Sequence, residues 1–321
     1  MSIAYPQWMP TLIGNAGAAW VRRLLILGLW FLVVATGCAS SGLSPAAVAP
    51  EWAARTLRTS PDAVLSLDVA AMRKDPFFGP LSARMLDDDR GGELSALRTA
   101  TRIDLFATAQ RTQKTWTAVI HGVRDPPAEL LARRWPRGGV RVGAAVVYEP
   151  TGRGSDGVWL SVRPGSWVLS STRPEDGVPD PVDMDGHAVF EAWLGPNAIA
   201  EGRASARPEA REMLRYIRAA RLTVDGGDAP GIAFDARFVS PADAQHAEYD
   251  AMTAQRQLEQ AADGSEFVKQ VLALIGQVEV ARHGEDLRVS VHATRAFSRY
   301  VLATIEARSH SRPMASSAIA P

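Results

Sequence analysis

Alternating apolar and polar residues predict β-strands along much of the chain, and the clearest examples lie in its C-terminal half. In residues 232–239 the apolar positions alternate with Asp235 and Arg237, and in residues 287–293 they alternate with polar positions that include His292. A period of two places successive side chains on opposite sides of a strand. Each of these strands is therefore expected to have one buried face and one hydrated face.

The same half contains two predicted β-hairpins. Residues 222–225 lead through the glycine-containing segment 226–231 into the strand at 232–239, because glycine lets the backbone reverse direction over a few residues. Residues 278–282 lead in the same way through His283-Gly284-Glu285 into the next strand. A helix is predicted after each hairpin, so this half consists of two related hairpin–helix units.

The helix after the first hairpin has a clear start and end. Ser240-Pro241-Ala242-Asp243 provides an N-cap, a proline at the first helical position and an acid at the third, which suits the free N–H groups of a helix start. Small apolar residues then recur at spacings of three and four, and they are Ala244, Ala247, Ala251, Ala254, Leu258 and Ala261, with Gly264 as the stop. So narrow an alanine stripe favours packing on a sheet over a coiled coil.

Shorter signals complete the predicted fold. Further strands are predicted at 63–69, 115–122, 140–148, 157–162 and 167–171. Further helices are predicted at 80–86, 127–135, 188–194 and 267–275, from Pro208 through Ile217, and over Phe297, Val301 and Ile305. Turns with glycine or proline between neighbouring strands indicate antiparallel pairing. The predicted fold class is α+β, with antiparallel sheets and helices packed on one face.

Composition places the chain among folded proteins and away from nucleic-acid binders. Its 321 residues are 46% hydrophobic and 22% charged, values typical of a globular protein with a packed core. Basic and acidic residues balance at 35 each, whereas a nucleic-acid-binding domain concentrates positive charge. This length predicts two domains of ordinary size.

The N-terminal segment has the pattern of an export signal. Arg22 and Arg23 precede the uncharged run from Leu24 to Gly37. Because the segment before these arginines is long, the translation start could be Met9 in place of Met1. A helix over that run would be about 21 Å long, shorter than the roughly 30 Å hydrocarbon core of a bilayer. The run is therefore interpreted as the apolar region of a signal peptide and not as a membrane span.

The end of this segment resembles the lipobox of bacterial prolipoproteins. Ala35-Thr36-Gly37 precede Cys38, the single cysteine of the chain, and in that family a small residue stands directly before the lipidated cysteine. The resemblance implies cleavage before Cys38 and attachment of the mature protein to a membrane through lipid on that residue. Ala39 replaces the aspartate that favours inner-membrane retention, so the resemblance also implies the outer membrane, with the protein facing the periplasm. The alternatives are an incidental thiol in another type of secretory peptide and a true membrane anchor.

Segment boundaries follow from this interpretation. We expect a signal peptide at 1–37, a flexible tether at 38–52, an N-terminal α+β domain at 53–199, a C-terminal α+β domain at 200–310 and a disordered tail at 311–321. The tether contains small residues and two prolines, a composition that does not form a packed core.

No motif in the sequence indicates a cofactor or a metal. The glycine spacing of a dinucleotide-binding motif occurs at Gly152-Arg153-Gly154-Ser155-Asp156-Gly157. That motif requires a helix after it, whereas β-type sequence on both sides predicts a hairpin loop here. Asp180, Asp183 and Asp185 lack the spacing of a calcium loop, and Asp87, Asp88 and Asp89 are interpreted as an exposed helix end. The histidines His121, His187, His246, His283, His292 and His310 show no metal-binding spacing, and His283 and His292 are expected at the surface.

Three hypotheses for function remain. The first is a non-enzymatic envelope lipoprotein that binds or scaffolds another envelope component, with the membrane contacted through the N-terminal lipid. The second is a carrier of lipid or another apolar ligand, because Trp116, Trp135, Trp159, Trp167 and Trp193 crowd the first domain, although core packing explains them more simply. The third is a hydrolase whose site is assembled from dispersed acids such as Asp68 and Asp104.

Overall fold

The computed structural model describes residues 61–87, 97–110, 113–151, 157–174, 188–205, 214–264, 272–273, 276, 278–299 and 303. Its strands are β1 (Ala63–Asp68), β2 (Arg102–Gln110), β3 (Gln113–His121), β4 (Gly139–Val142), β5 (Ala145–Tyr148), β6 (Trp159–Arg163), β7 (Ser166–Ser170), β8 (Ala188–Leu194), β9 (Ile217–Asp225), β10 (Gly231–Phe238), β11 (Val278–His283) and β12 (Asp286–His292). Its helices include α4 (Val69–Lys74), α5 (Phe78–Asp87), α6 (Ala128–Arg134), α7 (Pro196–Ser205) and α9 (Pro241–Gly264).

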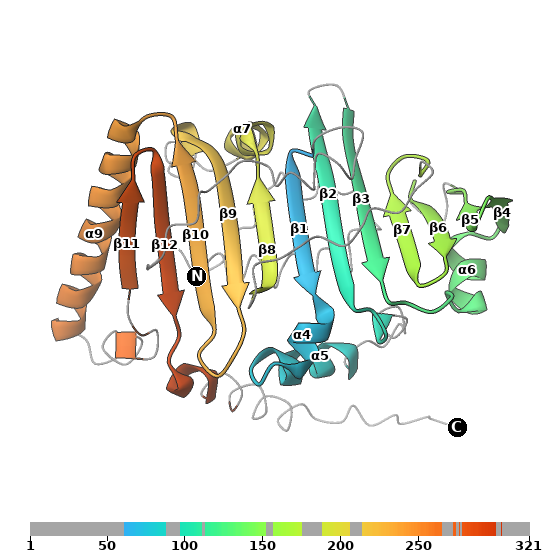
Figure 1. The fold of residues 1–321 in the computed structure, drawn as a ribbon, viewed down its shortest axis with the longest axis horizontal. Coiled ribbons are helices and arrows are strands. Elements are labelled where there is room, and N and C mark those ends of the chain that lie inside the picture. Colours follow the sequence, from blue (N-terminus) through green and yellow to red (C-terminus); the bar gives the residue numbers. More distant parts are fainter. Residues whose placement is uncertain are drawn as a thin grey trace, which may run out of the picture.

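All twelve of these strands form one antiparallel sheet. Their order is β11-β12-β10-β9-β8-β1-β2-β3-β7-β6-β5-β4, and Figure 1 shows the arrows side by side in this order. β8 joins the two halves, because it pairs with β1 through Ala63↔Leu194 and with β9 through Glu191↔Thr223. The domain boundary predicted near residue 200 falls in α7, between two strands that are hydrogen-bonded neighbours, and the division into two domains stays a prediction.

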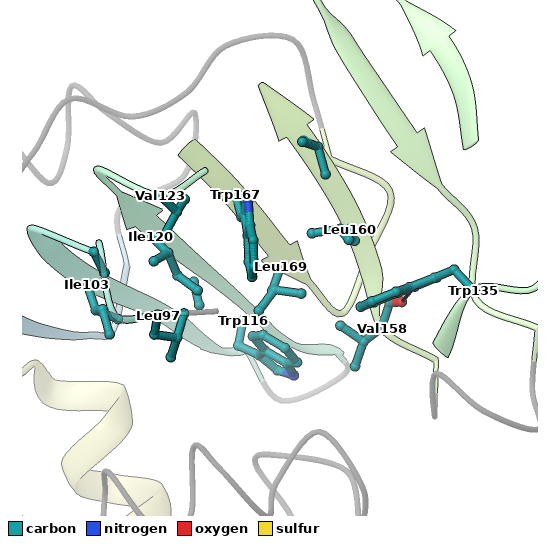
Figure 2. Close-up of a cluster of buried hydrophobic side chains, with 13 residues drawn as sticks. Leu97, Ile103, Trp116, Ile120, Val123, Trp135, Val158, Leu160, Trp167 and Leu169 are labelled. Atoms are coloured by element: carbon teal, nitrogen blue, oxygen red, sulfur yellow. Dashed lines mark hydrogen bonds between the residues drawn. The ribbon is translucent and has the colours of Figure 1, made fainter. Parts of the chain in front are cut away.

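One face of the sheet is apolar and carries the hydrophobic core. Over β2, β3, β6 and β7 it forms a cluster of buried side chains that includes Trp116, Trp167, Ile120, Leu160 and Leu169, and Figure 2 shows them gathered on these strands. Trp135, which follows α6, joins this cluster and donates from Nε1 to the carbonyl oxygen of Val158 at 2.9 Å. A buried indole N–H without an acceptor would be destabilising, so this bond fixes the position of the ring.

The helices of the described residues contribute to this apolar face. Ala244 of α9 and Ile199 of α7 pack with Ala220, Ala236 and Leu287 from β9, β10 and β12. Small side chains at Ala244 and Ala247 let α9 approach the strands closely, as the alanine stripe predicted. A third cluster joins Phe77 and Phe78 to Val189 and Val224 at the start of α5.

Most of the predicted elements are confirmed. The fold class is α+β with antiparallel pairing, and both C-terminal hairpins occur as β9–β10 and β11–β12. The predicted start of α9 is confirmed as well, since Ser240 Oγ accepts from the Asp243 N–H at 3.2 Å. Gly284 turns the second hairpin with a φ of 60°, a left-handed conformation that favours glycine.

Three predicted elements are wrong in type or extent. Residues 188–194 form strand β8 and not a helix, because their nearly unbroken apolar run suits a strand covered on both sides as well as it suits a helix, and two neighbouring strands bond to it. Residues 140–148 form two strands, β4 and β5, separated at Gly143, whose φ is 58°. Ile217 opens strand β9 and does not end a helix.

Strand β2 and helices α4 and α7 have no counterpart among the predictions. The sequence of β2 alternates, but no strand was predicted there, because its polar positions include the charged residues Arg102 and Asp104. The predicted signal peptide, tether and tail lie outside the described residues. So do most residues of the two helices predicted at 208–217 and 267–275. Among the described residues, no helix is long and apolar enough to cross a membrane.

Candidate binding face

The opposite face of the sheet carries a row of buried polar residues. Direct cross-strand partners share a face, and the register aligns Ser290, Ala233, Thr223, Glu191, Ser66 and Asp104 across β12, β10, β9, β8, β1 and β2. All of these side chains are buried, with Asp104 at 0% and Ser66 at 1% exposure. We call this side of the sheet the polar face.

Ion pairs neutralise the charges on the C-terminal half of this face. Arg221 donates from Nε to Glu191 Oε1 at 2.9 Å, and Arg288 Nη1 lies 3.6 Å from Asp235 Oδ1. Asp235 is the direct cross-strand partner of both arginines. Charges of alternating sign thus cross three adjacent strands, which lowers the cost of burying each of them.

The same strands hold a bidentate pair nearer to the hairpin turn. Arg237 donates from Nε and Nη2 to the two carboxylate oxygens of Asp286, at 2.8 and 2.9 Å. These hydrogen bonds raise the pKa of the Arg237 guanidinium above its ordinary value. The fork geometry fixes the register of β10 against β12.

A second polar cluster lies on the N-terminal half of the face. Arg102 donates from Nε to Asp104 Oδ1 at 3.1 Å, and His121 Nε2 lies 3.4 Å from Asp104 Oδ2 without the geometry of a hydrogen bond. Ser166 and Arg163 continue the row from His121 onto β7 and β6. We call Arg102, His121, Ser166 and Arg163 the basic corner.

The buried side-chain polar atoms that lack a hydrogen-bond partner, as far as the described residues go, all belong to the polar face. They are Ser66 Oγ, Arg102 Nη2, His121 Nε2, Ser161 Oγ, Arg163 Nε, Glu191 Oε2, Trp193 Nε1, Arg288 Nε and Ser290 Oγ. Folded proteins pair the large majority of such atoms, since each unpaired one costs about 1–3 kcal/mol. The unpaired side-chain atoms of the described residues are therefore confined to one side of the sheet.

Apolar residues share the middle of the polar face. Val64, Phe106, Val119 and Val168 are 4% exposed or less, and Trp193 is 6% exposed. The register aligns Trp193, Val64 and Phe106 in one row, two residues along each strand from the row of Glu191, Ser66 and Asp104. The face therefore combines an apolar centre with polar groups on both sides of it.

The two acids proposed for a dispersed catalytic site have structural contacts. Asp68 is the N-cap of α4, where its Oδ1 accepts from the Ala71 N–H at 2.7 Å. Asp104 pairs with Arg102 and His121 as described above. The register puts both acids on the polar face at diagonal positions of neighbouring strands. The two residues are therefore close, but each carboxylate contacts other groups and not the other acid.

The tryptophans divide between the two faces of the sheet. Trp116, Trp135 and Trp167 belong to the buried apolar cluster, which confirms core packing for them. Trp193, also buried, lies on the polar face beside Val64 and Arg221. Trp159 lies on the polar face as the direct partner of Ser170.

The remaining candidates have simpler outcomes. His283 and His292 are exposed, as predicted. Strands β5 and β6, on either side of the predicted hairpin loop at 152–157, pair antiparallel, and residues 152–156 lie outside the described residues. Cys38, His187, His310, Asp88, Asp89, Asp180, Asp183 and Asp185 lie outside the described residues, as does the side chain of Asp87. The described part of the chain contains no group of three or more potential metal ligands.

The polar face was not predicted from the sequence. Asp235 and Ser290 were expected on hydrated faces, yet both are 3% exposed. A signal did exist, because acids and bases occupy directly opposed strand positions, such as Asp235 with Arg288. That signal becomes readable only when the strand pairing and register are known.

Comparison with known proteins gives a fold likeness alone. No protein-family model matches the chain, and no curated protein matches it. Among solved structures, crystal form I of TP0453 is similar over 76% of this chain and 95% of that chain, with a TM-score of 0.40 and 10% sequence identity. Crystal form IV of TP0453 is similar over 77% of this chain and 93% of that chain, with a TM-score of 0.41 and 9% identity.

Proposed function

We propose that this protein is a lipid-anchored protein of the bacterial cell envelope whose polar face binds another envelope component without catalysing a reaction. The observation that supports binding is the restriction of unpaired buried polar atoms to that face. A sheet selected for stability alone would pair or replace such groups. A partner that supplies the missing donors and acceptors would remove this cost on binding.

The anchor part of the proposal depends on Cys38 and the residues around it. Cleavage before Cys38 would leave a lipidated N-terminus followed by a tether of small residues, which lets the folded part stand away from the bilayer. A single acyl chain holds a protein only marginally at a membrane, whereas two or more give stable attachment. By analogy with lipoproteins that lack aspartate after the cysteine, Ala39 favours the outer membrane, with the protein facing the periplasm.

A second candidate is a carrier of lipid or another apolar ligand. The observation that favours it is the apolar centre of the polar face, formed by Val64, Phe106, Val119, Val168 and Trp193. An amphiphile could place its chain on this centre and its polar group beside the unpaired donors. Native mass spectrometry of the protein purified from membranes separates the two functions, since a carrier retains a mixture of apolar ligands and a binding or scaffolding protein does not.

Cys38→Ser tests the anchor. The variant should lose radiolabelled palmitate and move from the membrane fraction to the soluble fraction, while Ser40→Ala, two residues away, should remain attached. Unchanged membrane attachment of Cys38→Ser would overturn the anchor.

Affinity capture from native membranes, with Arg288→Gln on the polar face and exposed Arg256→Gln as its control, should recover a defined envelope partner with the control variant only. Because Arg288 pairs with buried Asp235, circular dichroism must show Arg288→Gln folded under the capture conditions, and Ser290→Ala, which removes only an unpaired hydroxyl, should weaken recovery as well. Equal recovery with both variants, or reproducible hydrolysis of an envelope polymer, would count against the proposed binding role.

A further inference from the structure

The basic corner brings three nitrogen-bearing side chains into one line at the ends of four strands. Arg102 is the direct partner of His121, His121 of Ser166, and Ser166 of Arg163. Neighbouring strands lie about 4.8 Å apart, so the Cα atoms of Arg102 and Arg163 are separated by roughly 14 Å. Two long arginine side chains therefore flank a histidine and a serine on the same side of the sheet.

Each of the three nitrogen-bearing side chains retains an unused polar atom. Arg102 Nη2, His121 Nε2 and Arg163 Nε are buried and lack a hydrogen-bond partner. Arg102 and His121 nevertheless keep 14% and 13% of their side-chain surface exposed. The unpaired nitrogens of the corner are thus sheltered from water, while other atoms of Arg102 and His121 remain in contact with solvent.

The acids around the corner leave one arginine uncompensated. Asp104 contacts Arg102 and His121, and Asp68, the cross-strand partner of Arg102, caps α4. Arg163 forms no ion pair with any described residue, so its charge is not balanced within the corner. An anion is the ligand that would satisfy it.

We infer that the basic corner binds a phosphate-type oxyanion. The group could be free phosphate or the phosphodiester of a lipid headgroup, since both offer oxygens in a tetrahedral arrangement. The oxygens of either group can accept from two guanidinium groups and an imidazole at once. This inference rests on the proposed binding function and names the chemistry of one part of that face.

Arg163→Gln is the first test, because it removes a charged donor that has no partner to leave behind. Titration of inorganic phosphate into the full chain in nonionic detergent, followed by calorimetry, should show binding that becomes at least about tenfold weaker in the variant, as expected for a hydrogen bond to a charged group. His121→Gln should weaken binding as well. Arg141→Gln removes the same charge from the exposed strand β4 and should leave the phosphate affinity unchanged.

The source of the phosphate is separated by a second titration. If the headgroup phosphodiester is the ligand, the protein should bind micelles of the same detergent doped with phosphatidylglycerol more tightly than micelles doped with diacylglycerol, which has no phosphate. Arg163→Gln should abolish this difference. Phosphate binding without any micelle effect would identify free phosphate. The inference is overturned if phosphate binds no better than chloride at equal ionic strength, or if Arg163→Gln and His121→Gln bind it like the wild type. That failure differs from failure of the proposed function, which is measured by membrane attachment and partner capture.

Discussion

Charged residues on the polar face are held in place by their direct neighbours. Glu191 is 7% exposed and Asp235 is 3% exposed, and each has an arginine within ion-pair distance. Burying an ion pair gives little net stability, but removing one partner leaves an uncompensated charge. Arg221 and Arg288 are therefore required for stability even where they take part in binding.

Arg221→Gln should test this dependence. The substitution leaves the buried Glu191 carboxylate without its ion-pair partner. We therefore expect a loss of about 2–3 kcal/mol in the free energy of unfolding, measured by urea denaturation. Arg295→Gln is the matched control, because Arg295 and Asp228 form an exposed pair with 74% and 59% side-chain exposure. A loss no larger in Arg221→Gln than in Arg295→Gln would contradict the assigned role of the buried pair.

At the same scale, sequence patterns identified the apolar positions better than the polar ones. Ile232 and Phe234 were expected to face the interior and do point to the apolar face, but both remain partly exposed, while Asp235 is buried. The expectation failed because alternation reports which residues share a face and not which face is covered. Polar burial depends on cross-strand partners such as Arg288, which no local pattern contains.

Among the elements, α9 shows the most complete agreement between sequence and structure. Its predicted cap and its end at Gly264 occur, and Ala244 and Ala247 of the predicted stripe pack on the sheet, whereas Ala254 is exposed. Ser240 Oγ both accepts from the Asp243 N–H and donates to Asp243 Oδ2 at 2.6 Å. A local signal specified this helix, because the contacts that start it join Ser240 to Asp243 and Ala244.

Ser240→Ala should measure the contribution of this cap. The loss of one acceptor for the first turn is expected to cost about 1 kcal/mol of unfolding free energy, detectable as a lower thermal midpoint. Thr253→Ala, in the middle of the same helix, should change stability by less than about 0.5 kcal/mol. Equal effects of the two substitutions would show that the cap does not stabilise α9.

Elements whose identity depends on distant residues were predicted poorly. The apolar run of β8 has no periodicity that separates a strand from a buried helix, and β1 and β9 decide the outcome. The same holds for β2, where the buried acid Asp104 resembles a surface residue until its partners Arg102 and His121 are known. The candidate binding face is made almost wholly of such positions.

Across the whole molecule, the single sheet couples both halves through its centre. β1 and β8 have hydrogen-bonded neighbours on both sides, whereas β4 is a short strand at one edge. Local opening is easiest where few contacts must be broken. The stability of the sheet should therefore fall from β8 and β1 towards β4.

Hydrogen–deuterium exchange should reveal this gradient. Backbone amides of β1 and β8 are expected to exchange slowest, and those of β4 fastest. β11, at the opposite edge but in contact with α9, serves as the internal control and should exchange more slowly than β4. Uniform protection across these strands would contradict a sheet that is most stable at its centre.

The pairing of β1 with β8 also has a consequence for how the chain folds. The hairpins β2–β3, β9–β10 and β11–β12 join residues close in sequence, so they can form as soon as each segment is available. Ala63 must instead find Leu194, and such long-range closure is slow because the loop entropy is lost before the contact is gained. Until that closure, both halves present unpaired strand edges, and this period is when the newly made protein is most open to aggregation and most in need of a chaperone.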